Sequence, residues 1–518
     1  MNPTEPLSSP PEQPPSRTER AFSGWLWMSS GAGVQGLVTV GVLAVLARLL
    51  TPADFGSVSA AMLVINLSLL VSQGFVGPAL VQQPRLREAH VETALSLSLL
   101  GAGLLGALLW AFAPAVAVAL HVPSLTAIVR VLVWVLPIQG LSAVADALLR
   151  RDLQFRTVAA FRMISFALGY GAVGITVAVL GGGLWALVAA NASQATLNTA
   201  LLLGRNPHTL RFRLHRRELG ELLSFTGGFS LGRIGNYAAV NGDYLVVVRW
   251  LGVTALGLYE RAYQLMAAPA TLVGQVLDDV LFPAMAQIQS ERQRVAVAYR
   301  RCVAGVALLT LPLSALALVL APEIVRVLLG PGWTEVTAPF RVLVLGTLFR
   351  TSYKISDSLT RALGAVYRRA WRQWSYAALV IGGGIVGQRW GITGVAWVVL
   401  LALLVNFGLT AHLGTRLVGM GWREYVGAHG PALRAAGVVG VSAWAFAAAA
   451  RALGAPAAGV LGITLAGTGA VLGSVVWMRN GDWLLGRDGQ WLRERLGGFC
   501  RNALRRVRPA RAVVGGVL

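Results

Sequence analysis

Charged residues are scarce in this chain of 518 residues: they make up 13% of it, whereas hydrophobic residues make up 55%. A soluble protein of this size could not hide so much apolar surface, so the composition excludes a string of soluble domains. It favours a polytopic helical membrane protein, because only helices and closed barrels satisfy their backbone groups in lipid. The apolar runs are about 20 residues long and do not alternate, which excludes a barrel.

Lysine, cysteine and histidine are rare, and each scarcity excludes a class of chemistry. Lys354 is the only lysine and follows Tyr353 rather than glycine, so the chain has no G-K-[ST] phosphate loop and is not a P-loop ATPase. Cys302 and Cys500 have no local partner and predict no disulfide framework. The six histidines are not paired at metal-ligand spacing. We therefore expect no cofactor, no metal and no catalytic constellation, that is, a protein that is not an enzyme.

The apolar runs predict an all-α protein of about fourteen transmembrane helices, arranged as two six-helix lobes and two extra C-terminal helices. The expected helices are 23–47, 55–80, 91–113, 127–149, 157–180, 184–203, 226–250, 255–279, 302–321, 339–362, 373–388, 391–413, 432–450 and 457–478. The expected organisation is a disordered tail (1–20), an N-lobe (21–204), a cytoplasmic linker (205–225), a C-lobe (226–413), the extra helices (414–478) and a basic amphipathic tail (479–518).

Arginine placement predicts the orientation. If the N-terminus is cytoplasmic, 32 of the 44 lysines and arginines fall in the tails and inside loops, 7 fall outside, and 5 lie within helices. This asymmetry alternates at every turn, as the positive-inside rule requires. Because inside loops carry most of the positive charge, the value of +22 indicates a cytoplasmic-membrane protein with both termini inside rather than a nucleic-acid partner. We expect contacts with membrane lipids.

Two short matches indicate that the lobes are internal repeats in the same orientation. The segment RLLTPADFG, residues 48–56, is similar to RWLGVTALG, residues 249–257, and pairs Gly56 with Gly257. Phe22-Ser23-Gly24 is similar to Phe225-Thr226-Gly227, at nearly the same offset. Parallel repeats of this kind are typical of transporters with a substrate site between two lobes.

The segment 339–363 carries charges where a membrane should exclude them. Arg350, Lys354, Asp357 and Arg361 follow one another at i, i+4, i+7 and i+11, so they form a stripe on one helix face. A charge at mid-bilayer costs roughly 2.5–3.5 kcal/mol on the mildest scale, so the stripe must face protein or water. One interpretation is a structural ion pair between Lys354 and Asp357. The other is a hydrated cavity for an anionic substrate, since three cations face one anion.

The expected helix 226–250 also has a polar face, and this face is too wide for one salt bridge. It comprises Arg233, Asn236, Tyr237, Asn241, Asp243 and Tyr244. Ten residues separate Arg233 from Asp243, about 15 Å along a helix, which argues against direct pairing. The candidate cavity residues are therefore Arg233, Asn241, Asp243, Arg350, Lys354, Asp357 and Arg361.

Other polar side chains in the helices are assigned structural roles. Glu260, Arg261 and Gln264 fall near the expected outer end of their helix, where an interfacial role is favoured. In the first lobe, Asn66, Gln73 and Asp146 are interpreted as helix–helix hydrogen bonds. By this assignment the first lobe is less charged than the second.

Three segments carry a family resemblance. NGDYLVVVRWLGVTALGLYERAYQL (241–265), VLFPAMAQIQ (280–289) and ARLLTPADFG (47–56) resemble bacterial polysaccharide or oligosaccharide flippases, of the multidrug/oligosaccharidyl-lipid/polysaccharide exporter superfamily. The resemblance spans about residues 20–430. It implies two six-helix lobes in a V shape, alternating access, and an undecaprenyl-pyrophosphate-linked oligosaccharide as cargo. It assigns no binding residues.

We therefore expect a flippase that carries a polyprenyl-pyrophosphate-linked oligosaccharide across the cytoplasmic membrane for polysaccharide export. Polysaccharide polymerase and export proteins are the expected protein partners. A peptidoglycan-precursor flippase and a cation-coupled multidrug exporter of the same fold remain alternatives. A membrane glycosyltransferase or polymerase is an alternative of another class, but it would need catalytic carboxylates and long outside loops, which we do not find.

Overall fold

The computed structural model describes residues 36, 38–73, 76–83, 85–206, 211–276, 285, 291–363, 366–478, 483–486 and 488–490. Every regular element in these ranges is helical, which confirms the predicted all-α class. Eight helical stretches there are long and apolar enough to cross a membrane. The expected helices 184–203, 226–250, 255–279 (described to residue 276) and 339–362 are also largely helical but are not among those eight. They carry most of the polar side chains considered below. The two predicted tails lie mostly outside the described residues.

The N-lobe begins with the helix Val38–Leu49. Its further elements are α2 (Pro52–Gln73), α3 (Val76–Gln82), α4 (Glu88–Leu120), α5 (Leu125–Leu132), α6 (Val135–Arg151), α7 (Phe155–Phe166), the π-helix η1 (Ala167–Gly174), α8 (Ile175–Val179) and α9 (Leu184–Arg205). The expected helix 127–149 is divided between α5 and α6, and the expected helix 157–180 contains the π-helical turn.

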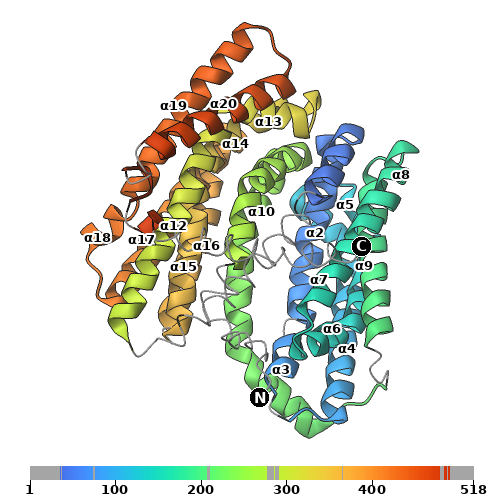
Figure 1. Cartoon of the computed structure of the whole chain (residues 1–518). Coiled ribbons are helices and arrows are strands. Elements are labelled where there is room, and N and C mark those ends of the chain that lie inside the picture. The colour runs from blue at the N-terminus through green and yellow to red at the C-terminus, as the bar shows by residue number, and fades with distance from the viewer. Residues whose placement is uncertain are drawn as a thin grey trace, which may run out of the picture.

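The longest described helix, α10, runs from Arg216 to Val276 and lies at the middle of the molecule, between α2 and the other helices of the C-lobe (Figure 1). It comprises the two expected helices, 226–250 and 255–279, which meet at a break, and it begins ten residues earlier than expected, so it takes up part of the predicted linker. Gly252 interrupts it with a φ of 85°, a backbone conformation that residues with a Cβ rarely adopt. On one side α10 packs along α2, and on the other it packs against the C-lobe.

The rest of the C-lobe follows α10. Its elements are α12 (Arg292–Val319), α13 (Ala321–Leu328), η3 (Pro331–Val336), α14 (Thr337–Leu345), α15 (Thr347–Ala362), α16 (Val366–Gly387), η4 (Gln388–Trp390), α17 (Gly391–Val418) and α18 (Trp422–Gly427). The expected single helix 339–362 is divided at Gly346, where an added Cβ would lie 3.0 Å from Leu403 of α17. The charged stripe therefore belongs to α15 alone.

The two extra helices are α19 (Gly430–Ala452) and α20 (Ala457–Met478), close to the predicted bounds. They pack on α12 and α13 at the side of the C-lobe farthest from the N-lobe (Figure 1). Arg451 of α19 donates to Glu323 of α13 at 2.8 Å, which fixes the pair to the lobe. They are additions to the C-lobe and do not separate the two lobes.

The two lobes meet at the repeat glycines. A Cβ added to Gly56 would lie 1.8 Å from the carbonyl oxygen of Val253, and one added to Gly257 would lie 1.9 Å from that of Pro52. The two contacts are equivalent, because Pro52 and Gly56 each correspond to the residue 201 positions later. A contact in which equivalent residues exchange roles is what a two-fold relation between the repeats produces. Only glycine at both positions allows the backbones to approach so closely.

Candidate functional site

Asp243 lies in the first half of α10 and is buried, with 1% of its surface exposed. Its Oδ2 accepts a hydrogen bond of 2.9 Å from the Tyr259 hydroxyl, and its Oδ1 accepts one of 3.0 Å from the backbone N–H of Tyr244. Tyr259 comes from the second half of α10, beyond the break at Gly252. The carboxylate therefore joins the two halves of the helix, and both of its oxygens are occupied.

Arg350 of α15 reaches the same group of tyrosines. Its Nη1 donates to the Tyr263 hydroxyl, and its guanidinium lies 4.8 Å from the centre of that ring. Tyr244 and Tyr263 meet edge to face, with ring centres 5.5 Å apart. The predicted residues Asp243 and Arg350 thus belong to one cluster, which we call the tyrosine cluster: Asp243, Tyr244, Tyr259, Tyr263 and Arg350. It connects α10 with α15.

The remaining predicted residues are more dispersed. Lys354 and Asp357 are half-buried on α15, one and two turns beyond Arg350, and both make contacts there. Arg233 and Arg361 lie in α10 and α15, but their side chains are outside the described part of the chain. Asn241 is half-buried on α10, and its side chain donates to the carbonyl of Tyr237 at 3.0 Å.

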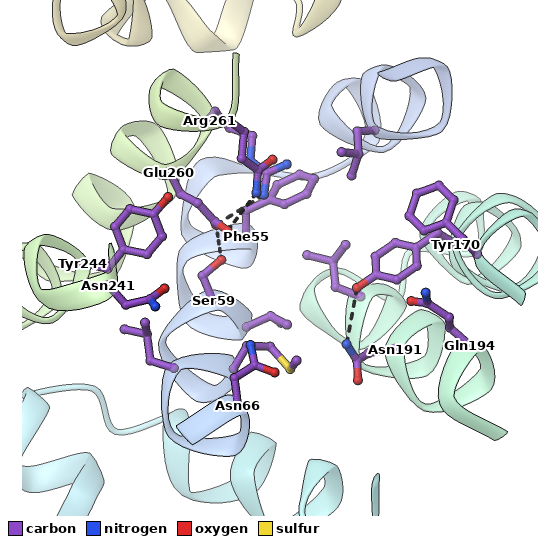
Figure 2. Close-up of a pocket in the computed structure, with 17 residues that line it drawn as sticks. Phe55, Ser59, Asn66, Tyr170, Asn191, Gln194, Asn241, Tyr244, Glu260 and Arg261 are labelled. Atoms are coloured by element: carbon purple, nitrogen blue, oxygen red, sulfur yellow. Dashed lines mark hydrogen bonds and ion pairs between the residues drawn. The ribbon is translucent and has the colours of Figure 1, made fainter. Parts of the chain in front are cut away.

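A cavity of about 310 Å³ lies between α10 and the N-lobe (Figure 2). Its N-lobe wall comes from the helix Val38–Leu49, α2, α7, η1 and α9, and its other wall comes from both halves of α10. The polar residues that line it are Ser59, Asn66, Tyr170, Asn191, Gln194, Asn241, Tyr244, Glu260, Arg261 and Gln264. Among the predicted site residues with described side chains, Asn241 lines it. Tyr244 connects this cavity to the tyrosine cluster behind it.

All charged side chains in the cavity wall come from α10. Glu260 and Arg261 form an ion pair at 3.3 Å, and Gln264 donates to Glu260 at 2.9 Å. The Ser59 hydroxyl of α2 donates to the same carboxylate, so this hydrogen bond crosses from one lobe to the other (Figure 2). The Arg261 guanidinium lies 4.5 Å from the centre of the Phe55 ring. Its Nε–H is buried without a hydrogen-bond partner among the described residues, so Arg261 retains a donor.

The charge of this wall differs from the expectation of a strongly basic cavity. Among the described side chains, one cation and one anion line it, and they are paired. The reason is that Arg350 turns to Tyr263 rather than to the cavity. Sequence reasoning gave Glu260, Arg261 and Gln264 an interfacial role because it placed them near a helix end. The break at Gly252 lies in the expected boundary between helices 226–250 and 255–279, but the sequence does not show that the second half of α10 is turned so that these residues face the first lobe.

The first-lobe residues that were expected to form helix–helix hydrogen bonds have different surroundings in the structure. Asp146 of α6 accepts a hydrogen bond of 2.7 Å from Arg150 on the same helix and lies 3.6 Å from Arg162 of α7, so it does join two helices. Asn66 instead lines the cavity. Asn191 and Gln194, which also line it, were not singled out from the sequence, although their spacing of three places them on one face of α9.

The known proteins that this chain resembles take part in polysaccharide biosynthesis or transport. The family model described as "Polysaccharide biosynthesis protein" matches residues 45–338, more than half of the chain. The chain is 28% identical to the succinoglycan biosynthesis transport protein ExoT of Rhizobium meliloti over 60% of this chain and 62% of that protein. It is 23% identical to the teichuronic acid biosynthesis protein TuaB of Bacillus subtilis over 76% and 82%, and 21% identical to the lipopolysaccharide biosynthesis protein WzxC of Escherichia coli over 79% and 84%. The match to ExoT thus spans less than two thirds of that protein.

Solved structures share the fold at low sequence identity. The lipid II flippase MurJ, in an inward closed conformation, superposes with a TM-score of 0.68 at 12% identity, over 80% of this chain and 92% of that one. An inward-facing multidrug transporter of the MATE family superposes with a TM-score of 0.54 at 15% identity, over 77% and 94%. These likenesses show that the chain has the fold of these two structures, and they do not identify its cargo.

Proposed function

The chain belongs to the polysaccharide biosynthesis protein family, and from that membership we propose that it is a flippase for a polyprenyl-pyrophosphate-linked oligosaccharide. The oligosaccharide moves across the cytoplasmic membrane by alternating access of the two lobes, and the polyprenyl tail stays in lipid. The named relatives take part in the synthesis or transport of three different bacterial polysaccharides, which supports a saccharide cargo.

The observation that carries the proposal is the polar cavity between two largely apolar lobes. Polar side chains inside transmembrane helices are costly unless they face protein or water, and here they line a space between α10 and the N-lobe. The Ser59–Glu260 hydrogen bond crosses that space and can break when the lobes separate. Transporters of this build bind their substrate where the lobes meet.

Cations of α10 and α15 are proposed to receive the pyrophosphate. Arg261 has a buried N–H without a partner in the described part of the chain and lines the cavity, and arginine's planar fork suits phosphate oxygens. Arg350 is separated from the cavity by Tyr263 and Tyr244 in this arrangement, so it and Lys354 would engage the anion in another state of the transport cycle. This keeps Arg350, Lys354 and Arg233 as functional candidates, alongside Arg261.

The alternatives differ in cargo or in chemistry. A peptidoglycan-precursor flippase shares the fold and the pyrophosphate, so the saccharide distinguishes it. A multidrug exporter of organic cations calls for an acidic cavity, whereas the described wall holds Glu260 already paired with Arg261. A glycosyltransferase or polymerase would need unpaired carboxylates in a cavity, and the described cavity wall carries none. The absence of a phosphate loop supports transport without ATP hydrolysis.

The proposed direction requires both termini in the cytoplasm, as the arginine asymmetry predicts. Reporter fusions after residues 90, 210, 295 and 420 should report the cytoplasm, and fusions after 123, 182 and 331 should report the outside. The points 123 and 182 lie between helices, and 331 is the first residue of η3. Inversion at two or more of the seven fusion points would overturn the orientation.

Deletion of the gene tests the function in cells. The lipid-linked oligosaccharide should accumulate on the inner leaflet while surface polysaccharide is lost, and the wild-type chain should restore both. An unchanged amount of surface polysaccharide, together with a new sensitivity to organic cations, would favour the multidrug exporter. Lysis with accumulation of the peptidoglycan precursor would favour the precursor flippase.

A further inference from the structure

The N-lobe wall of the cavity differs in chemistry from the α10 wall. Its described residues include no charged side chain, and their polar groups include the amides of Asn66, Asn191 and Gln194 and the hydroxyl of Tyr170. Figure 2 shows Tyr170 and the two α9 amides close together, across the cavity from Glu260 and Tyr244. A ligand that binds both walls therefore meets neutral donors and acceptors on one side and charges on the other.

The π-helix η1 sets the position of Tyr170. A Cβ added to Gly169 would lie 2.8 Å from atoms of Gln194, and one added to Gly174 would lie 3.0 Å from the Cβ of Ala190. These glycines let η1 lie directly against α9, so the Tyr170 ring comes beside the α9 amides. Phe166 stacks on Tyr170 with ring centres 5.1 Å apart and 18° between the planes. π-helical turns inside α-helices occur often at functional sites.

The side-chain amides of this wall can form more hydrogen bonds than they make with the other described residues. Asn191 donates to the Tyr170 hydroxyl at 3.5 Å, the outer limit for such a bond. Asn66 and Gln194 make no side-chain hydrogen bond with any other described residue, although both face the cavity. Each amide offers two donors and an acceptor. An amide group that packed helices together would be expected to have its partners within the protein.

We propose that Asn66, Tyr170, Asn191 and Gln194 form a subsite for a neutral sugar ring of the transported oligosaccharide. A pyranose carries hydroxyls that both donate and accept, which amides match and fixed charges do not. Its C–H face is apolar and packs on an aromatic ring, here the Phe166–Tyr170 pair. This inference rests on the proposed function and deepens it: α10 takes the pyrophosphate, and the N-lobe wall takes the adjoining sugar.

Binding of two probe lipids to the purified full-length chain in lipid nanodiscs tests the subsite. One probe is a polyprenyl pyrophosphate without sugar, and the other carries a neutral hexose disaccharide. Wild type should bind the glycosylated probe about tenfold more tightly, which corresponds to two ordinary hydrogen bonds. The variant Asn191→Ala/Gln194→Ala should lose that preference and keep its affinity for the sugar-free probe. Thr196→Ala, at an exposed position of the same helix, should behave as wild type.

The outcomes separate the subsite from the proposed function. Equal affinity of wild type for the two probes, or a preference that survives in the double variant, overturns the subsite while the flippase stands. Failure of wild type to bind either probe overturns the proposed function. Retained binding of the sugar-free probe shows that a variant is folded. If the double variant is not folded, Asn191→Leu and Gln194→Leu, which keep side-chain volume, are tested singly, each with an expected loss of about threefold to fivefold in the preference.

Discussion

The two lobes share a framework and differ in what they place at the centre of the molecule. Their contact at Gly56 and Gly257 is reciprocal, as expected of two repeats. The charged side chains near the cavity, by contrast, are distributed unequally between the two lobes. In the described part of the second lobe, Asp243, Glu260, Arg261 and Arg350 lie inside helices next to the cavity or directly behind it.

None of the ion pairs described for the first lobe lines the cavity. Asp146 joins α6 to α7, and two further pairs lie near the start of α10. His90 of α4 and Glu221 of α10 meet at 3.0 Å, and His215 meets Glu92 at 3.1 Å, where the chain passes from one lobe to the next. Symmetry in the backbone thus leaves each lobe free to line the cavity with its own chemistry. The second lobe provides charge, and the first provides neutral hydrogen-bonding groups.

Disrupting the contact between the lobes at Gly56 and Gly257 should have the largest effect, a loss of stability. Gly56→Ala or Gly257→Ala places a methyl group within 2 Å of a backbone carbonyl of the other lobe. We expect a destabilisation at or above the upper end of the roughly 1–3 kcal/mol typical of overpacking, because backbone cannot move aside as a side chain can. The thermal midpoint of the purified protein measures it. Gly103→Ala is the matched control, since a Cβ there meets nothing within 4 Å, and an equal effect in both would contradict the account of the lobe contact.

Removing charge from the second lobe should lower transport more than folding. Replacement of Arg350 or Lys354 by Gln deletes a cation and keeps a hydrogen-bonding side chain. A desolvated charge-assisted contact is worth roughly 1.5–3 kcal/mol, so export should fall about tenfold to a hundredfold. Membrane abundance and surface glycan are measured together.

The structural ion-pair interpretation of α15 predicts a different pattern. If Lys354 only neutralises Asp357, Lys354→Gln should lower the amount of folded protein, and adding Asp357→Asn should restore both abundance and export. The binding interpretation expects the double variant to be abundant and still poor at export. Full surface glycan in the double variant would therefore exclude a binding role for Lys354.

The smallest expected effect is a pH-dependent change in stability from Glu221, which contacts His90 of the first lobe. The hydrogen bond from His90, and then that from Arg217, hold the pKa of Glu221 below its ordinary value of 4.5. A lowered folded-state pKa gives a contribution to stability that is complete above pH 4.5 and is lost as the pH falls through the lowered value. Wild type should thus lose more of its thermal midpoint on acidification than Glu221→Gln does. Parallel losses in the two proteins would show that this contact contributes nothing measurable.

The sequence predicts more of the fold than of the candidate site. Apolar length predicts the helical class and most of the described helices, and the repeat match at Gly56 and Gly257 identifies two residues that meet in space. The break at Gly252 falls between the expected helices 226–250 and 255–279, whereas the break at Gly346 lies inside the expected helix 339–362 and is not predicted. The sequence does not show how each helix is turned at such a break. That orientation places Glu260 and Arg261 in the cavity wall and Arg350 against Tyr263.

Neutral residues were the harder part of the site to predict. A charge inside an apolar helix is conspicuous because its burial is costly, whereas Asn191 and Gln194 are ordinary residues in any helix. Their role depends on the close approach of η1 to α9, which Gly169 and Gly174 permit. The spacing of Asn191 and Gln194 places them on one face of a helix, but it does not predict which residues that face contacts.

The central claim is that this chain moves a lipid-linked oligosaccharide between leaflets without hydrolysing ATP. The most direct measurement reconstitutes the purified chain in vesicles with a fluorescent polyprenyl-pyrophosphate oligosaccharide and follows its exposure to a membrane-impermeant quencher. The account predicts that the protein accelerates exposure of the inner-leaflet lipid in the absence of ATP, with or without an imposed ion gradient, and that Arg261→Gln slows this. A rate equal to that of protein-free vesicles under both gradient conditions, or acceleration only when ATP is added, would contradict it.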